Sequence, residues 1–159
     1  MPYVSFHEYF PEIAKSETRS ITILEGASSG LPAGEYGFLE MYCDERKCDC
    51  RRVFFYVVSL PKKEPLAVIA YGWEGPEFYA EWMGDDDPDI IEELKGPFLN
   101  MGSPQSSLAP AILKLVENVL LKDKSYVERI KTHYRMFRDR IDRKLLSKRR
   151  RGKIKKRKM

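Results

Sequence analysis

The sequence lacks any long apolar run and any secretion signal. No segment of its 159 residues approaches the run of about 20 apolar residues that spans a bilayer. The first residues also lack the basic stretch and the following apolar stretch of a signal peptide. We therefore expect a cytoplasmic protein that has no membrane partner.

The sequence is also poor in the residues and motifs of common catalytic sites. It has only two histidines and no Gly-x-Ser-x-Gly motif, so a Ser-His-Asp set cannot be assembled from it. The glycine-rich segment 26–34 lacks the lysine that ends a phosphate-binding loop. The acids at 85–89 are explained by a helix N-terminus, which favours aspartate for electrostatic reasons. We therefore expect a protein that is not an enzyme.

All three cysteines fall within eight residues, in the pattern C-x4-C-x-C. Cys43, Cys48 and Cys50 lie between two strand-like runs, 36–42 and 53–58, so they occupy the tip of a predicted β-hairpin. An odd number of clustered cysteines in a reducing compartment is more typical of a metal site than of a disulfide. Cysteine thiolates are preferred ligands of zinc. The pattern therefore predicts a structural Zn²⁺ site at the hairpin tip.

Three cysteines leave one position of a tetrahedral zinc site to be filled, and the customary pair of C-x2-C motifs is absent. His133 is the preferred fourth ligand, because it lies beside the apolar stripe of the last predicted helix, between Ile130 and Phe137. Three reduced cysteines without metal, and a redox pair of Cys43 with Cys48 or Cys50, remain as alternatives. The other candidates for the fourth position are His7, Asp44, Asp49 and water.

The net charge of +4 conceals a strong asymmetry. Residues 122–159 carry 18 Lys and Arg against 4 acids, whereas residues 1–121 carry 10 basic and 20 acidic residues. A basic tail of this kind neutralises phosphates and thereby binds DNA or RNA. Its last part, residues 148–159, has no aromatic residue for stacking on bases. The predicted phosphate-binding residues are Lys148, Arg149, Arg150, Arg151, Lys153, Lys155, Lys156, Arg157 and Lys158.

The pattern of apolar residues predicts an α+β fold. Strands are expected at 20–24, 36–42, 53–58 and 66–71 and form a small antiparallel meander. Helices are expected at 89–94, at 108–121 and from a capping box at Ser125 to about residue 147, and they pack against the sheet. The segment 72–84 is expected to be irregular. Residues 1–147 then form one domain, followed by a basic, disordered tail at 148–159.

Three functional hypotheses follow. The first is a non-enzymatic, nucleic-acid-associated protein with a structural zinc site and a phosphate-binding tail. The second is a protein–protein adaptor, in which an acidic body and exposed aromatic residues such as Trp73 and Trp82 recognise a partner. The third is a metal-dependent or cysteine-based enzyme, which requires an open coordination position or a reactive thiol.

Overall fold

A computed structural model describes the backbone of residues 3–158 and the side chains of residues 3–143. It confirms the α+β class: a six-stranded antiparallel sheet has the strand order β1-β3-β4-β5-β6, and β2 pairs with β3 as well. All four strands of the predicted meander, at 20–24, 36–42, 53–58 and 66–71, are present in this sheet. The strands are β1 (Tyr3–Ser5), β2 (Arg19–Ile23), β3 (Gly34–Cys43), β4 (Arg52–Leu60), β5 (Glu64–Gly72) and β6 (Phe98–Leu99).

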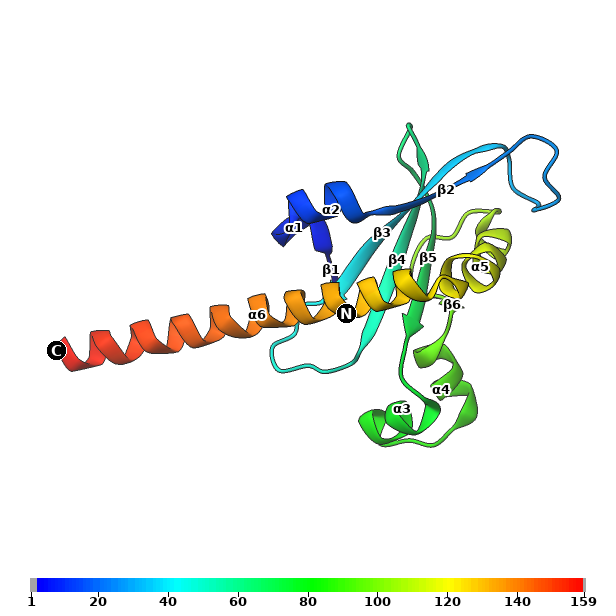
Figure 1. Ribbon diagram of the computed structural model, residues 1–159. Coiled ribbons are helices and arrows are strands. Elements are labelled where there is room, and N and C mark those ends of the chain that lie inside the picture. The colour runs from blue at the N-terminus through cyan, green and yellow to red at the C-terminus, as the bar shows by residue number, and fades with distance from the viewer. Residues whose placement is uncertain (1–2, 159) are drawn as a thin grey trace.

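The helices lie on the sheet and at its end (Figure 1). They are α1 (Phe6–Tyr9), α2 (Pro11–Glu17), α3 (Pro76–Met83), α4 (Pro88–Lys95), α5 (Ala109–Asn118), the 3-10 helix η1 (Leu120–Lys122) and α6 (Lys124–Lys158). The segment expected to be irregular therefore contains a helix, α3. Each helix of the described residues is too short or too polar to cross a bilayer.

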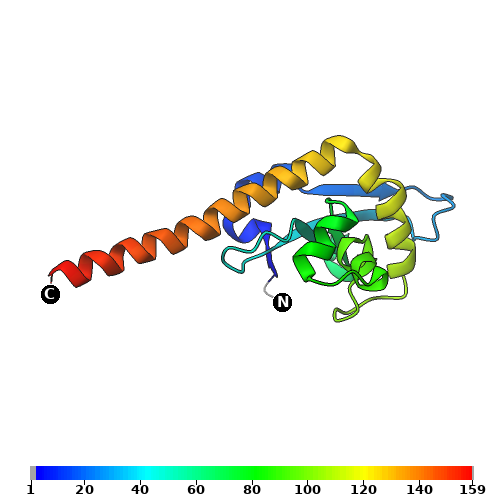
Figure 2. The same cartoon turned by 90° about the horizontal axis from the view of Figure 1, so that it is seen from below.

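The last helix is longer than expected and begins one residue earlier. Asp123 Oδ1 accepts a hydrogen bond from the amide of Tyr126 at 3.3 Å, so Asp123 caps α6 instead of Ser125. The helix continues to Lys158, and its C-terminal half extends beyond the rest of the protein (Figures 1 and 2). The division into a domain at 1–147 and a tail at 148–159 remains a prediction.

The main core lies between one face of the sheet and the two C-terminal helices. Alternate residues of the central strands point to this face, as the period of two requires. Helix α6 covers it with apolar residues at spacings of three and four, which places them on one stripe. Each fully buried side chain of this kind stabilises the fold by about 1.5–3 kcal/mol. The core includes Phe38, Tyr42, Val53, Phe55 and Ile69 from the sheet and Ile112, Tyr126, Ile130, Phe137 and Ile141 from the helices.

The other face of the sheet carries a smaller apolar cluster around Phe54, Val68 and Ala70. The ring of Tyr3 stacks on Phe54 with 3.9 Å between ring centroids. Helix α4 approaches this face, since its residue Leu94 lines a pocket together with Phe54 and Ala70. The two faces of the sheet therefore have different environments, one covered by α5 and α6 and the other partly open.

Strands β1 and β2 pair with the same edge of β3, one after the other. Strand β1 pairs with positions 41–43 and β2 with positions 34–38, while α1 and α2 connect the two strands. On its other edge β3 pairs with β4, and the last pair in that register joins Met41 and Phe54. The cysteine loop (residues 43–51) connects β3 to β4 at this end of the sheet.

Candidate metal centre

The three cysteines converge at the tip of the β3–β4 hairpin. The Sγ atoms of Cys43, Cys48 and Cys50 all lie within 4.8 Å of one another, and all three thiols are free. Cys43 and Cys50 are buried, and Cys48 is half-buried. Sulfur atoms that share a tetrahedral zinc lie about 3.8 Å apart, because each Zn–S bond is about 2.3 Å long. The spacing of these sulfurs therefore suits one soft metal ion after a small inward movement.

The cysteine loop contains two residues with left-handed backbone. Lys47 has φ of 62° and Arg51 has φ of 49°, a conformation that non-glycine residues adopt rarely and at a cost of about 1 kcal/mol or more. The amides of both residues are bound by side chains of α6: Lys47 N donates to Asp142 Oδ1 at 3.3 Å, and Arg51 N donates to Tyr134 Oη at 3.1 Å. Helix α6 therefore stabilises the strained positions of the loop.

Arg138 binds the same loop between those two contacts. Its guanidinium donates hydrogen bonds to the carbonyl oxygens of Glu45 and Cys48, each at 2.7 Å, and to that of Cys43. The side chain is buried, and its Nε is a buried donor without a hydrogen-bond partner among the described residues. Tyr134, Arg138 and Asp142 are spaced by four, so one face of α6 holds the backbone of the cysteine loop.

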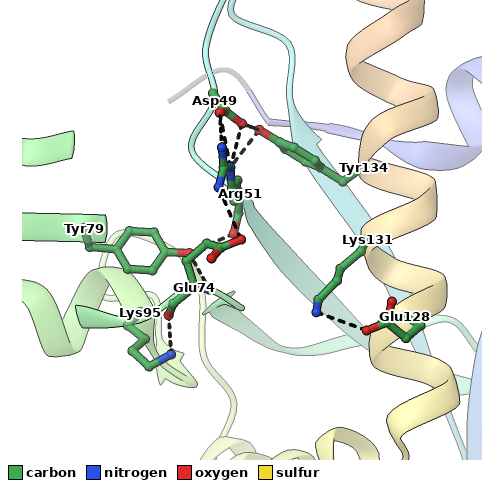
Figure 3. Close-up of polar contacts among 8 residues, drawn as sticks. All are labelled: Asp49, Arg51, Glu74, Tyr79, Lys95, Glu128, Lys131 and Tyr134. Atoms are coloured by element: carbon green, nitrogen blue, oxygen red, sulfur yellow. Dashed lines mark hydrogen bonds and ion pairs between the residues drawn. The ribbon is translucent and has the colours of Figure 1, made fainter. Parts of the chain in front are cut away.

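The last residues of the loop are tied to three other elements (Figure 3). The guanidinium of Arg51 forms ion pairs with Asp49 at 2.9 Å and with Glu74 at 3.4 Å. Its carbonyl oxygen accepts a hydrogen bond from Tyr79 of α3 at 2.8 Å, and Tyr134 of α6 donates to Asp49 Oδ1 at 3.0 Å. These contacts fix the direction in which the chain leaves Cys50 and enters β4.

The pKa values of the three thiols differ because the thiols are hydrogen-bonded to one another. Hydrogen bonding from Cys50 lowers the pKa of Cys43 to about 6, against the opposing effect of burial, and the amide of Glu45 and the charge of Arg138 lower it further. The same hydrogen bond, together with burial, raises the pKa of Cys50. Burial and the charge of Cys43 raise the pKa of Cys48. These shifts favour the thiolate form at Cys43 and the thiol form at Cys48 and Cys50.

The structure does not bring His133 into the cysteine group. Its ring nitrogens contact two carboxylates instead: Nδ1 lies 2.7 Å from Glu40 Oε1, and Nε2 lies 2.5 Å from Glu17 Oε2. Glu40 is buried in the core and also accepts hydrogen bonds from Tyr42 at 2.5 Å and Tyr126 at 3.2 Å. His133 does lie on the inward side of α6, as its place beside the apolar stripe predicted, but its partners there are acids.

The environment of His133 favours its charged form. Burial lowers the pKa of His133, but the hydrogen bonds and charges of Glu40 and Glu17 outweigh burial and hold the pKa above its ordinary value. The imidazole ring links three elements, because Glu17 ends α2, Glu40 lies on β3 and His133 belongs to α6. This cluster joins the N-terminal helices to the last helix.

The remaining candidates for a fourth ligand differ in their surroundings. His7 is exposed on α1 and lines a small pocket with His133 and Glu40, which places it with the buried acids. Asp49 is engaged by Arg51 and Tyr134. Asp44 is half-buried within the cysteine loop itself. Asp44 and water therefore remain the candidates that the geometry leaves open.

One further feature of the site was not predicted. Arg138 was not named as a site residue, yet it is buried and donates hydrogen bonds to three carbonyls of the cysteine loop. Its spacing of four from Tyr134 and Asp142 was a signal available in the sequence. The nine basic residues predicted to bind phosphate, from Lys148 to Lys158, lie outside the residues whose side chains the structure describes.

A scan against models of protein families gives no match to this chain, and searches of curated proteins and of solved structures give none either.

Proposed function

We propose that this chain is a non-enzymatic, nucleic-acid-associated protein whose hairpin tip is organised by one Zn²⁺ bound to Cys43, Cys48 and Cys50. The observation that carries the proposal is the convergence of three free thiols, with all Sγ atoms within 4.8 Å, in a loop held from outside by α6. Thiolates select zinc and other soft ions over magnesium and calcium. The half-buried loop is typical of a structural site.

The zinc ion would strengthen contacts that the protein already makes. Zinc bound to three thiolates leaves a net charge of −1 at the site, and the buried guanidinium of Arg138 beside it offsets that charge. Because α6 binds the backbone of the cysteine loop through Tyr134, Arg138 and Asp142, a rigid loop also fixes α6. In this proposal, the metal sets the direction in which the basic tail (residues 148–159) leaves the domain.

The nucleic-acid part of the proposal rests on the distribution of charge. The segment 122–159 carries 18 basic residues against 4 acidic ones, while the rest of the chain is acidic. A helix with this charge density attracts phosphate and releases counterions when it binds, without reading the base sequence. The acidic body repels nucleic acid, so contact is restricted to the tail.

The metal part is tested by native mass spectrometry of the untagged protein, purified under reducing conditions without added metal. We expect one zinc ion per chain, and loss of it in each of Cys43→Ser, Cys48→Ser and Cys50→Ser. His133→Gln is the matched control and should keep the zinc, because its nitrogens are bound by carboxylates. A folded, metal-free wild-type protein that also fails to take up added Zn²⁺ would refute the proposed site.

The adaptor hypothesis predicts a different result in a pull-down. If the acidic body recognises a protein, capture of the partner survives nuclease treatment. If the basic tail binds nucleic acid, nuclease removes the captured material. Of the aromatic residues invoked for the adaptor hypothesis, Trp73 is half-buried and packs against the main core, whereas Trp82 is 38% exposed.

A further inference from the structure

A pocket of about 600 Å³ lies on the face of the sheet opposite α6. Its floor is the smaller apolar cluster, with Met41, Phe54 and Ala70 from three neighbouring strands. Helix α4 forms one wall with Ile90 and Leu94. Pockets that bind small molecules have volumes of about 300–1,000 Å³ and mostly apolar linings. The size and lining suit a small ligand with an apolar body.

Two exposed methionines stand at the rim of this pocket. Met83, at the end of α3, is 49% exposed, and Met101, in the turn after β6, is 82% exposed. Methionine side chains are flexible and polarizable, so they adapt to apolar ligands of different shape. A ligand in the pocket would give the exposed side chains of Met83 and Met101 an apolar surface to cover.

The pocket also contains a buried positive charge. Arg52 is 4% exposed, its Nε donates to the carbonyl oxygen of Leu94 at 2.8 Å, and its Nη1 donates to Tyr3 Oη at 3.2 Å. The guanidinium lies over the ring of Phe54, 5.2 Å from the centroid. Both hydrogen-bond acceptors are neutral, and among the described residues no carboxylate forms an ion pair with Arg52.

A buried charge is normally paired, because removal from water is costly unless an opposite charge compensates. The carbonyl of Leu94 compensates in part, since it lies in the last turn of α4, where the helix dipole is negative. A guanidinium has five N–H donors, and these two contacts leave donors for a bidentate acceptor. The acidic residue of the lining, Glu93, is exposed, so water screens its repulsion of an anion.

We propose that this pocket binds a small organic anion, a monocarboxylate with an unbranched apolar chain. The carboxylate pairs with the guanidinium of Arg52, and the chain lies over Met41 and Phe54 against Leu94. The end of the chain leaves between Met83 and Met101. This binding site uses none of the three cysteines and none of the basic tail, although Arg52 directly follows the cysteine loop.

Methyl NMR of the full-length protein labelled with [13C-methyl]methionine tests the site directly. Octanoate, 1-octanol and octylammonium serve as probes with one chain length and three headgroup charges. We expect octanoate to shift the methyl signals of Met41, Met83 and Met101 saturably. Met136 is the internal control, since it packs against the main core on the other face of the sheet. Its signal should not move.

The comparison of the three headgroups tests whether the pocket prefers an anion. Because hydrogen bonds to a charged group are stronger than neutral ones, we expect octanoate to bind about tenfold more tightly than 1-octanol, and octylammonium more weakly than both. Equal binding of octanoate and 1-octanol would overturn the role of Arg52. A preference for octylammonium, or shifts of Met136 equal to those of the pocket methionines, would overturn the site.

Two variants separate the charge from the cavity. Arg52→Met should abolish the preference for octanoate over 1-octanol, and Ala70→Leu, which fills the floor and leaves Arg52 intact, should weaken both at least tenfold. Thermal unfolding establishes that each variant is folded. If neither folds, the comparison of headgroups on the wild-type protein still decides the proposal. Unchanged octanoate binding in a folded Ala70→Leu protein would contradict it.

Discussion

The guanidinium of Arg138, on α6, donates a hydrogen bond to the carbonyl oxygen of Cys43 at the end of β3. The same side chain binds two further carbonyls of the cysteine loop, and the side chains one turn before and one turn after it bind two loop amides. Helix α6 therefore recognises the backbone of the loop and leaves its three sulfurs unhindered. The conformation that brings the thiols together is set by a helix remote in sequence.

Replacing Arg138 should therefore destabilise both the fold and the metal site. In Arg138→Met three carbonyl oxygens lose a charged donor, and we expect the free energy of unfolding to fall by about 3 kcal/mol. Because the loop is no longer held, zinc affinity should fall at least tenfold. Urea denaturation and competition with a chromogenic zinc chelator measure the two effects.

Arg143→Met is the matched control, since Arg143 is exposed on the same helix. Its free energy of unfolding should stay within about 0.5 kcal/mol of the wild-type value. An Arg138→Met protein as stable as this control would show that the loop keeps its conformation without α6.

The sequence predicted the parts of this protein that depend on local pattern. Apolar residues at every second position located the central strands, and apolar residues at spacings of three and four located the long helix. The clustering of Cys43, Cys48 and Cys50 located the candidate site. It did not predict the partner of His133. A position beside an apolar stripe indicates burial, but whether a buried histidine meets thiolates or carboxylates depends on which strand lies opposite it. That strand presents Glu40, which lies on the same face of β3 as Tyr36, Phe38 and Tyr42 because alternate residues of a strand share a face.

Helix α3 was missed for a related reason. The segment 72–84 contains three glycines and a proline, residues that mark turns and loops. Its helix begins at Pro76, a residue tolerated in the first turn, and it is anchored by a tertiary contact, the burial of Tyr79. Contacts between residues distant in sequence outweighed local propensity at this position.

Gly72 provides the room that Tyr79 requires. A Cβ atom at Gly72 would lie 2.1 Å from Tyr79 Oη, the atom that donates to the carbonyl of Arg51. Gly72→Ala should therefore displace Tyr79 and lower the free energy of unfolding by about 1–3 kcal/mol, the usual cost of overpacking. Chemical denaturation measures the loss. Gly102→Ala is the control, because a Cβ there meets no atom within 4 Å, and equal stability of the two variants would contradict the proposed clash.

The His133 cluster should make stability depend on pH. The pKa of His133 is raised in the folded state. Above about pH 6.5 the folded protein therefore binds more protons than the unfolded chain, and its stability falls as the pH rises through the raised pKa. Each unit by which the pKa of His133 is raised adds about 1.4 kcal/mol to the free energy of unfolding. The full contribution is present below about pH 6.5. We expect His133→Gln to lose this component. The measurement is the free energy of unfolding of wild type minus that of His133→Gln from pH 6 to 9.

The comparison requires that other titrations cancel. Both proteins keep Cys43, Cys48 and Cys50, and the groups around His133 (Glu17, Glu40, Tyr42 and Tyr126) are common to both as well. His7→Gln serves as the control, since His7 is exposed. A difference between wild type and His133→Gln that stays constant, or grows, with rising pH would contradict a protonated His133 between two carboxylates.

Removal of residues 148–158 should abolish the salt-dependent part of nucleic-acid binding. The nine basic side chains of this segment are the ones expected to displace counterions, and the logarithm of affinity for duplex DNA falls with the logarithm of salt by about 0.9 for each phosphate contacted. Fluorescence anisotropy with a labelled duplex, at several salt concentrations, gives the slope. A variant in which each lysine of the segment is exchanged for arginine and each arginine for lysine keeps the charge and should keep the slope. If the truncated protein binds with the wild-type slope, the phosphate contacts lie elsewhere and the proposed role of the tail is wrong.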